Sequence, residues 1–138
     1  KNLFMDAELN FDHFVNQWAD KMLNGAIIKI VINDITKHLD TKDKDYFIKS
    51  RSQRFGISPK DMADKSIDSL NQLYKYISFL NSILEKQEFI SGDSIGYSDF
   101  LIAGSLKWGK QVTDVDLIDK NNTNMLIWYN KIENLFMR

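Results

Sequence analysis

The sequence contains no cysteine, which excludes disulfides, thiolate nucleophiles and cysteine-ligated metal sites. Its two histidines, His13 and His38, lie far apart in the chain, so we expect no metal site. An excess of one charge is also missing, because 18 basic and 19 acidic side chains give a net charge of −1. Nothing in this balance indicates nucleic acid or an anionic membrane as a partner.

Long apolar runs are absent as well. The run at residues 26–28 is interrupted by Lys29 before it resumes, and even the five apolar residues at 125–129 fall far short of the about 20 that a membrane span needs. The chain begins at Lys1 without the pattern of a signal peptide. Apolar residues make up 43% and charged residues 27% of the chain, a composition typical of a folded domain. We therefore expect one soluble domain over the 138 residues.

Apolar positions three or four residues apart predict one long helix from Phe11 to Leu39. The β-branched segment from Ile27 to Ile32 is also typical of a strand, but the apolar stripe crosses it without a change of phase, which favours the helix. Asn10 is the predicted N-cap of this helix, and its neighbours Leu9 and Phe14 would form a hydrophobic staple. The stripe consists of Phe11, Phe14, Val15, Trp18, Met22, Ala26, Ile30, Val31 and Ile35.

Three further helices are predicted. Ser58 as N-cap and Pro59 in the first turn indicate a helix that continues to about Glu88, after a short helical or irregular link over residues 46–56. The next helix should run from Tyr97 towards Val112, and a last one follows the polar loop 113–122. Four helices without a convincing pair of strands predict an all-α bundle.

The start of the helix at Tyr97 carries a set of capping signals. With Gly96 as N-cap, Asp99 falls at N3, where its carboxylate can accept the free N–H of the cap and complement the helix dipole. Ile95 and Phe100 then occupy the two positions of a hydrophobic staple. Since glycine offers no side-chain acceptor, we expect Gly96→Ser to be neutral or stabilising.

Residues 89–92 followed by 95–100 resemble the capping-box and staple segment of the buried helix in the C-terminal domain of cytosolic glutathione transferases. The link 46–56 is similar to one in a fungal branch of that family and its relatives near the bacterial β-etherases, and Trp128-Tyr129 resembles the family's late Trp-Tyr helix. The resemblance implies one helical domain of this type over residues 1–138, a cytoplasmic location and a homodimer.

The resemblance also implies an N-terminal thioredoxin-like domain that binds glutathione and activates its thiol. Nothing in the sequence matches such a domain, so we expect it to be absent from this chain and to be its partner. Glutathione would then be a co-substrate bound mainly by that domain. We expect no catalytic residue here and no activity from the isolated chain.

Candidate binding residues follow from the same resemblance. Phe14, Trp18 and Met22 would line a pocket for an apolar electrophile, although an aromatic stripe at helical spacing is also typical of core packing. Arg51 and Arg54 could bind an anion or form a structural salt bridge. Weaker candidates are Trp108 and the pair Asp34 and His38, which is more typical of an exposed helix pair than of proton transfer.

Two classes of function stay open at this point. One is the substrate-binding domain of a glutathione transferase-like enzyme. The other is a non-enzymatic interaction module or scaffold of the same fold, since helical domains of this type are reused in assemblies. A thioredoxin-like domain encoded upstream of Lys1 would favour the enzyme.

Overall fold

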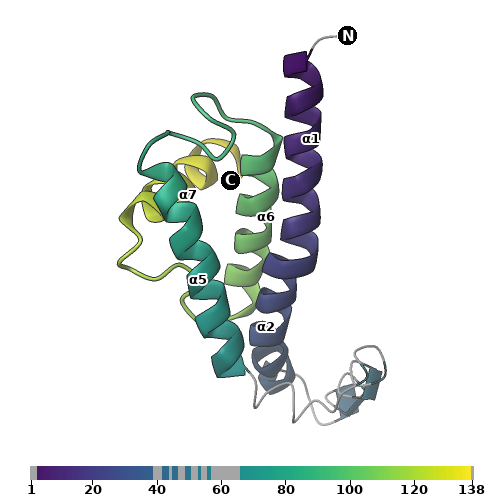
Figure 1. Ribbon diagram of the computed structural model, residues 1–138. Helices are drawn as coiled ribbons and strands as arrows, with labels where there is room; N and C mark the ends of the chain where they lie inside the picture. Colours follow the sequence, from purple (N-terminus) through teal and green to yellow (C-terminus); the bar gives the residue numbers. More distant parts are fainter. Residues whose placement is uncertain are drawn as a thin grey trace.

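The chain folds into helices joined by short connections (Figure 1). The computed structural model describes residues 3–38, 42–43, 45–46, 49–50, 53, 56 and 66–137. The elements are α1 (Leu3–Trp18), the π-helical segment η1 (Ala19–Leu23), α2 (Asn24–His38), α5 (Ser66–Leu84), α6 (Tyr97–Val112) and α7 (Thr123–Phe136). Among these described residues there is no strand, only a single bridge between Phe89 and Gly92. The prediction of an all-α fold is confirmed.

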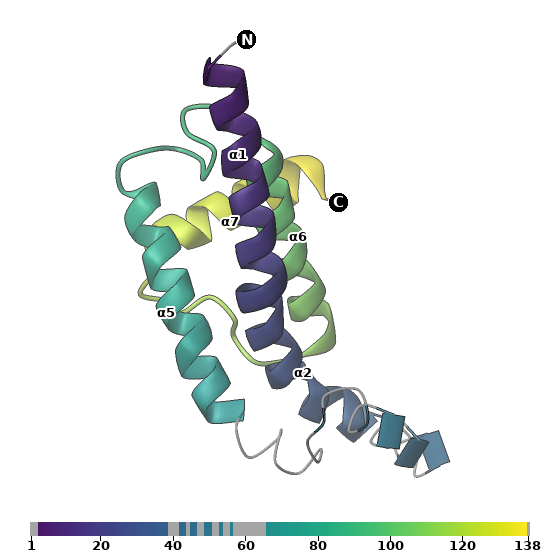
Figure 2. The same ribbon diagram turned by 45° about the vertical axis from the view of Figure 1, so that its right-hand side comes forward.

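The helices form an up-and-down arrangement. The segments α1, η1 and α2 follow one another as a single long helix, α5 returns in the opposite direction, and α6 runs beside the long helix (Figure 1). Helix α7 crosses the direction of the others and packs on α5 and α6 (Figure 2). None of the helices in the described part of the chain is long and apolar enough to cross a membrane.

The long helix confirms the helical interpretation of residues 27–32. Its start differs from the prediction, because α1 already begins at Leu3 and Asn10 lies inside it. The N-cap prediction for Asn10 is therefore wrong, and Leu9 is an exposed residue of the helix rather than half of a staple. The physical reason is that Met5, Ala7 and Glu8 are good helix formers, while one asparagine lowers helix propensity only modestly.

The core lies where the long helix, α5, α6 and α7 meet. Each of these helices contributes fully buried side chains, including Ile27, Ile77, Leu106 and Trp128. Burying one such side chain stabilises the fold by about 1.5–3 kcal/mol relative to leaving it exposed.

Helix α5 ends at Leu84, four residues before the predicted end. Its predicted start at Ser58 and Pro59 lies outside the described residues.

A side chain of α5 caps the start of α7. The side-chain oxygen of Asn81 accepts the Met125 N–H at 2.9 Å and so satisfies a free donor in the first turn of α7.

Candidate functional site

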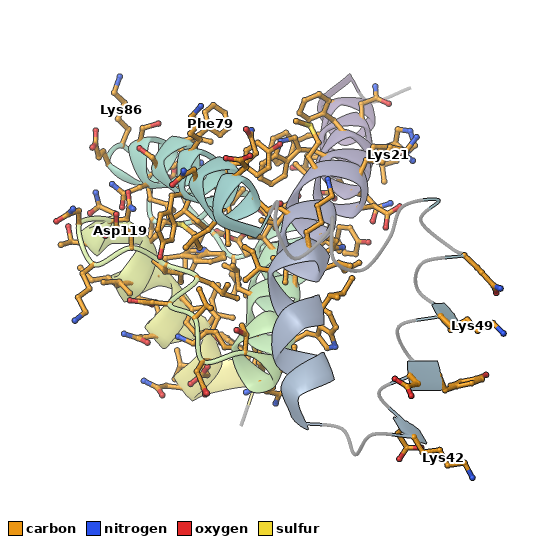
Figure 3. The ribbon with its side chains drawn as sticks, turned by 90° about the horizontal axis from the view of Figure 1, so that it is seen from below. Lys21, Lys42, Lys49, Phe79, Lys86 and Asp119 are labelled. Carbon is orange, nitrogen blue, oxygen red and sulfur yellow. The ribbon has the colours of Figure 1, made fainter. Side chains whose placement is uncertain are left out.

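An apolar groove opens between α1 and the C-terminal half of α5 and encloses about 190 Å³. Helical spacing brings its α1 members to one face, and Phe79 and Ile83, four residues apart, come from α5. Figure 3 labels Phe79 on α5. The apolar groove is lined by Phe11, Phe14, Val15, Trp18, Phe79, Leu80, Ile83, Ile90 and Ile102.

The groove has an aromatic rim and an aliphatic floor. At the rim, Phe14 is 68% exposed, Phe79 59% and Phe11 42%. The floor is formed by buried aliphatic side chains, among them Ile90 and Ile102. A ligand in the groove would therefore contact aromatic faces that the described chain leaves in water.

The chemistry of the groove is that of binding, not of catalysis. All the side chains that line it are apolar, and the indole N–H of Trp18 is the one polar group among them. No group there could take up a proton or activate a thiol near neutral pH. Burial of apolar ligand surface, worth about 25 cal/mol per Å², is what the groove can supply.

The three residues expected to form a substrate pocket are divided by the fold. Phe14 and Trp18 line the groove together. Met22 is 44% exposed and lines a separate polar cleft between η1–α2 and α5. The rings of Trp18 and Tyr76 stand between the two sites in an edge-to-face contact, with centroids 5.6 Å apart. The polar cleft is lined by Lys21, Met22, Gly25, Ala26, Lys29, Asp68, Ser69, Gln72 and Tyr76.

The α5 side of the groove was not predicted from the sequence. Phe79 and Ile83 lie beside the main apolar stripe of α5, which runs through Ile77 and Leu80 into the core. The sequence does carry one sign of it. Phe79 stands next to the apolar stripe of α5 and widens the apolar face of that helix beyond what the core needs.

The weaker candidates lie elsewhere. Arg51 and Arg54 are outside the described residues, and so are the side chains of Asp34 and His38. Trp108 is exposed and lines a third depression, the α6 hollow, which encloses about 670 Å³. The α6 hollow is lined by Asp20, Asn24, Ile28, Phe100, Leu101, Gly104, Ser105 and Trp108.

Asp99 stands at N3 of α6, where the capping interpretation placed it. Its Oδ2 accepts the Gly96 N–H at 3.0 Å, and the residue is completely buried. The same carboxylate accepts the N–H groups of Ile90 at 2.6 Å and Ser91 at 3.2 Å, and the indole N–H of Trp128 at 2.9 Å. The acid therefore joins three segments through charge-assisted hydrogen bonds.

The two predicted staple residues, Ile95 and Phe100, differ in burial. Ile95 packs against the core, while the Phe100 ring is exposed and meets the Phe136 ring edge-to-face at 5.4 Å. A Cβ on Gly96 would lie 2.6 Å from Ser91 Oγ and 2.8 Å from Ser91 Cβ. The turn before α6 occupies the space that a side chain at position 96 would need, so the structure favours a destabilising effect of Gly96→Ser over the neutral or stabilising one expected from the sequence.

Comparison with known protein families identifies the family of this chain. A family model described as glutathione S-transferase, C-terminal domain, matches residues 10–130. The matched residues include both walls of the apolar groove and the capping segment of α6. The comparison with curated proteins gave no match.

Proposed function

Because the chain belongs to the glutathione S-transferase C-terminal domain family, we propose that it is the substrate-binding domain of a glutathione transferase-like enzyme. In this proposal the domain holds an apolar electrophile beside the thiolate of glutathione. The thiolate performs the attack, and the activating residue belongs to a thioredoxin-like domain, with which C-terminal domains of this family normally pair.

The observation that carries this proposal is the apolar groove. Its exposed aromatic rim, above all Phe14 and Phe79, offers planar faces to an aromatic electrophile over a buried aliphatic floor. The absence of ionisable groups from the lining suits a division of labour in which this domain binds and the other domain activates the thiol.

The α6 hollow is a second exposed surface and shares no lining residue with the groove. Phe100 and Trp108 are exposed there beside polar Asp20 and Asn24. Large apolar side chains among polar ones are typical of an interdomain contact. The cytoplasmic location, the homodimer contact and the kinship with the fungal and β-etherase-like branch, all implied by the resemblance, belong to the same proposal.

The experiment compares the 138-residue chain with the same chain joined to a glutathione-binding thioredoxin-like domain. Glutathione and 1-chloro-2,4-dinitrobenzene are the substrates. We expect no turnover from the chain alone and turnover from the joined protein. In the joined protein, Phe14→Ala and Phe79→Ala should each raise the KM for the electrophile about fivefold to tenfold, as lost apolar contact requires.

The matched control is Phe136→Ala, which removes an exposed phenylalanine that does not line the groove. It should leave the KM for the electrophile unchanged, and all three variants should keep the KM for glutathione. Turnover by the isolated chain would contradict the proposal, and so would an unchanged KM for the electrophile in both Phe14→Ala and Phe79→Ala.

The second candidate function is a non-enzymatic interaction module. The observation that favours it is the high exposure of the same aromatic rim, which a protein partner would bury. The two functions are separated by the coding sequence upstream of Lys1 together with the turnover assay. An encoded thioredoxin-like domain supports the enzyme, and a different neighbouring domain supports the scaffold.

A further inference from the structure

The polar cleft differs in chemistry from the groove beside it. It encloses about 360 Å³, with Lys21, Gly25 and Lys29 on the side of the long helix and Ser69, Gln72 and Tyr76 on the side of α5. Figure 3 labels Lys21, which comes from η1. The Trp18–Tyr76 ring contact separates the cleft from the apolar groove, so the two can be occupied independently.

The charges of the cleft favour an anion. Lys21 and Lys29 are both exposed, and within the described part of the chain neither ammonium group has an ion pair. Asp68 is the one acid among the lining residues, so cations outnumber anions there although the whole chain carries −1. The amide of Gln72 and the hydroxyl of the buried Ser69 add neutral donors.

Gly25 has no structural explanation in the described chain. It lies inside α2, where glycine lowers helix stability relative to alanine. Its φ is not positive, and an added Cβ would meet no atom within 4 Å. Neither backbone conformation nor packing against described residues requires glycine, but its lack of a side chain keeps the cleft open.

The π-helical segment η1 lies directly before Gly25. Its Ala19 carbonyl accepts the Asn24 N–H, a bond that spans one residue more than in an α-helix. Segments of this kind inside α-helices occur frequently at functional sites. Here the segment supplies Lys21 and Met22 to the cleft.

We propose that the polar cleft binds a small aromatic carboxylate. Lys21 and Lys29 pair with its carboxylate, and the aromatic body lies over Gly25 against Ala26 and the Tyr76 ring. This site is distinct from the apolar groove and does not depend on the function proposed for the groove.

The test is calorimetric titration of the 138-residue chain with 2-naphthoate, using 2-naphthol as the neutral analogue. The unmodified chain should bind naphthoate at least about tenfold more tightly than naphthol. The double variant Lys21→Gln/Lys29→Gln should lose that preference. The control Lys75→Gln/Lys86→Gln removes two exposed lysines outside the cleft and should keep it.

Gly25→Ala supplies a readout that a purely structural role would not give. It should raise the Tm and weaken naphthoate binding at least about fivefold. Gly104→Ala, in α6 with equally open space around it, should raise the Tm without affecting binding. The proposal is overturned if the affinity for naphthoate is unchanged in the Lys21→Gln/Lys29→Gln and Gly25→Ala variants. It is also overturned if the affinity falls equally in the Lys75→Gln/Lys86→Gln control, or if Phe14→Ala in the apolar groove abolishes binding.

Discussion

The indole N–H of Trp128 donates to Asp99 Oδ1 at 2.9 Å and joins α7 to the start of α6 across 29 positions of the chain. Both residues are buried, so water does not compete for this bond. The same oxygen accepts the Ile90 N–H, and Oδ2 accepts the N–H groups of Ser91 and Gly96. The acid that begins α6 therefore also holds the preceding turn and the last helix.

Asp99→Asn should lower the free energy of unfolding by about 3 kcal/mol, more than loss of a simple cap. An asparagine has one acceptor oxygen, and its NH₂ group would oppose N–H donors that now face a carboxylate. Urea denaturation measures the loss. Asp93→Asn, an exposed acid in the same turn, is the control and should change stability by less than about 0.5 kcal/mol. Equal stability of the two variants would contradict the role of Asp99.

A double-mutant cycle tests the link to α7 directly. Trp128→Phe removes the indole donor, so its effect should differ between the unmodified chain and the Asp99→Asn variant. We expect a coupling energy of about 1 kcal/mol from urea denaturation, because the two groups share one buried hydrogen bond. Strict additivity would mean that this bond contributes nothing to the docking of α7.

Gly96→Ser should destabilise the fold by about 1–3 kcal/mol, because the new Cβ would approach Ser91 Oγ and Cβ below contact distance. Rotation of the Ser91 hydroxyl relieves one contact but not the one with its Cβ, and the Ser91 N–H is held by Asp99. Thermal denaturation measures the change. In the Ser91→Gly background the same substitution should cost much less, and an equal cost in both backgrounds would refute the steric explanation.

Gly109→Ala should destabilise the fold by a similar amount, about 1–3 kcal/mol. A Cβ there would lie 2.5 Å from Leu117 Cδ1 and 2.9 Å from Ile27 Cγ2, where α6 approaches α2 and the following loop. Gly104→Ala in the same helix is the matched comparison and should stabilise by about 0.5–1 kcal/mol, since its surroundings are open. Urea denaturation of the pair should give opposite signs.

Tyr129→Phe should stabilise the chain by about 1 kcal/mol at pH 7. The Glu133 carboxylate lies close enough to raise the pKa of the buried phenol, but within the described residues its oxygen makes no hydrogen bond of good geometry. Lys110 Nζ lies 4.8 Å from the ring centroid, a contact that phenylalanine keeps. The control is Tyr74→Phe, which removes a 2.6 Å bond to the Asp116 carbonyl and should lose about 1 kcal/mol.

The same variant has a predicted pH dependence. Burial and, after it, the Glu133 carboxylate raise the pKa of the Tyr129 phenol above its ordinary value. The folded chain then keeps this proton at a pH where the unfolded chain loses it. Stability from this source is complete below about pH 10 and is lost as the pH rises through the folded pKa. Tyr129→Phe should therefore show a shallower loss above pH 10 in denaturation series, and parallel curves would contradict the assignment.

Local patterns in the sequence predicted much of the fold. The bounds of α6 were predictable because Gly96, Asp99 and the residues around them interact within one helical turn. The long helix was predictable from the period of its apolar stripe. Asn10 shows where such reasoning fails, since a capping residue signals a helix start only if the chain before it is not itself helical.

The sequence by itself determined the all-helical fold and the position of Asp99 in its helix, because helical periodicity and capping depend on neighbours within a few residues, and it determined the family through motifs spread along the chain. The tertiary structure decided what those residues meet. It separated Met22 from Phe14 and Trp18, brought Phe79 to the groove, and set Ser91 against Gly96. The physical reason is that each helix shows several faces, and only packing against the other helices selects which face lines which site.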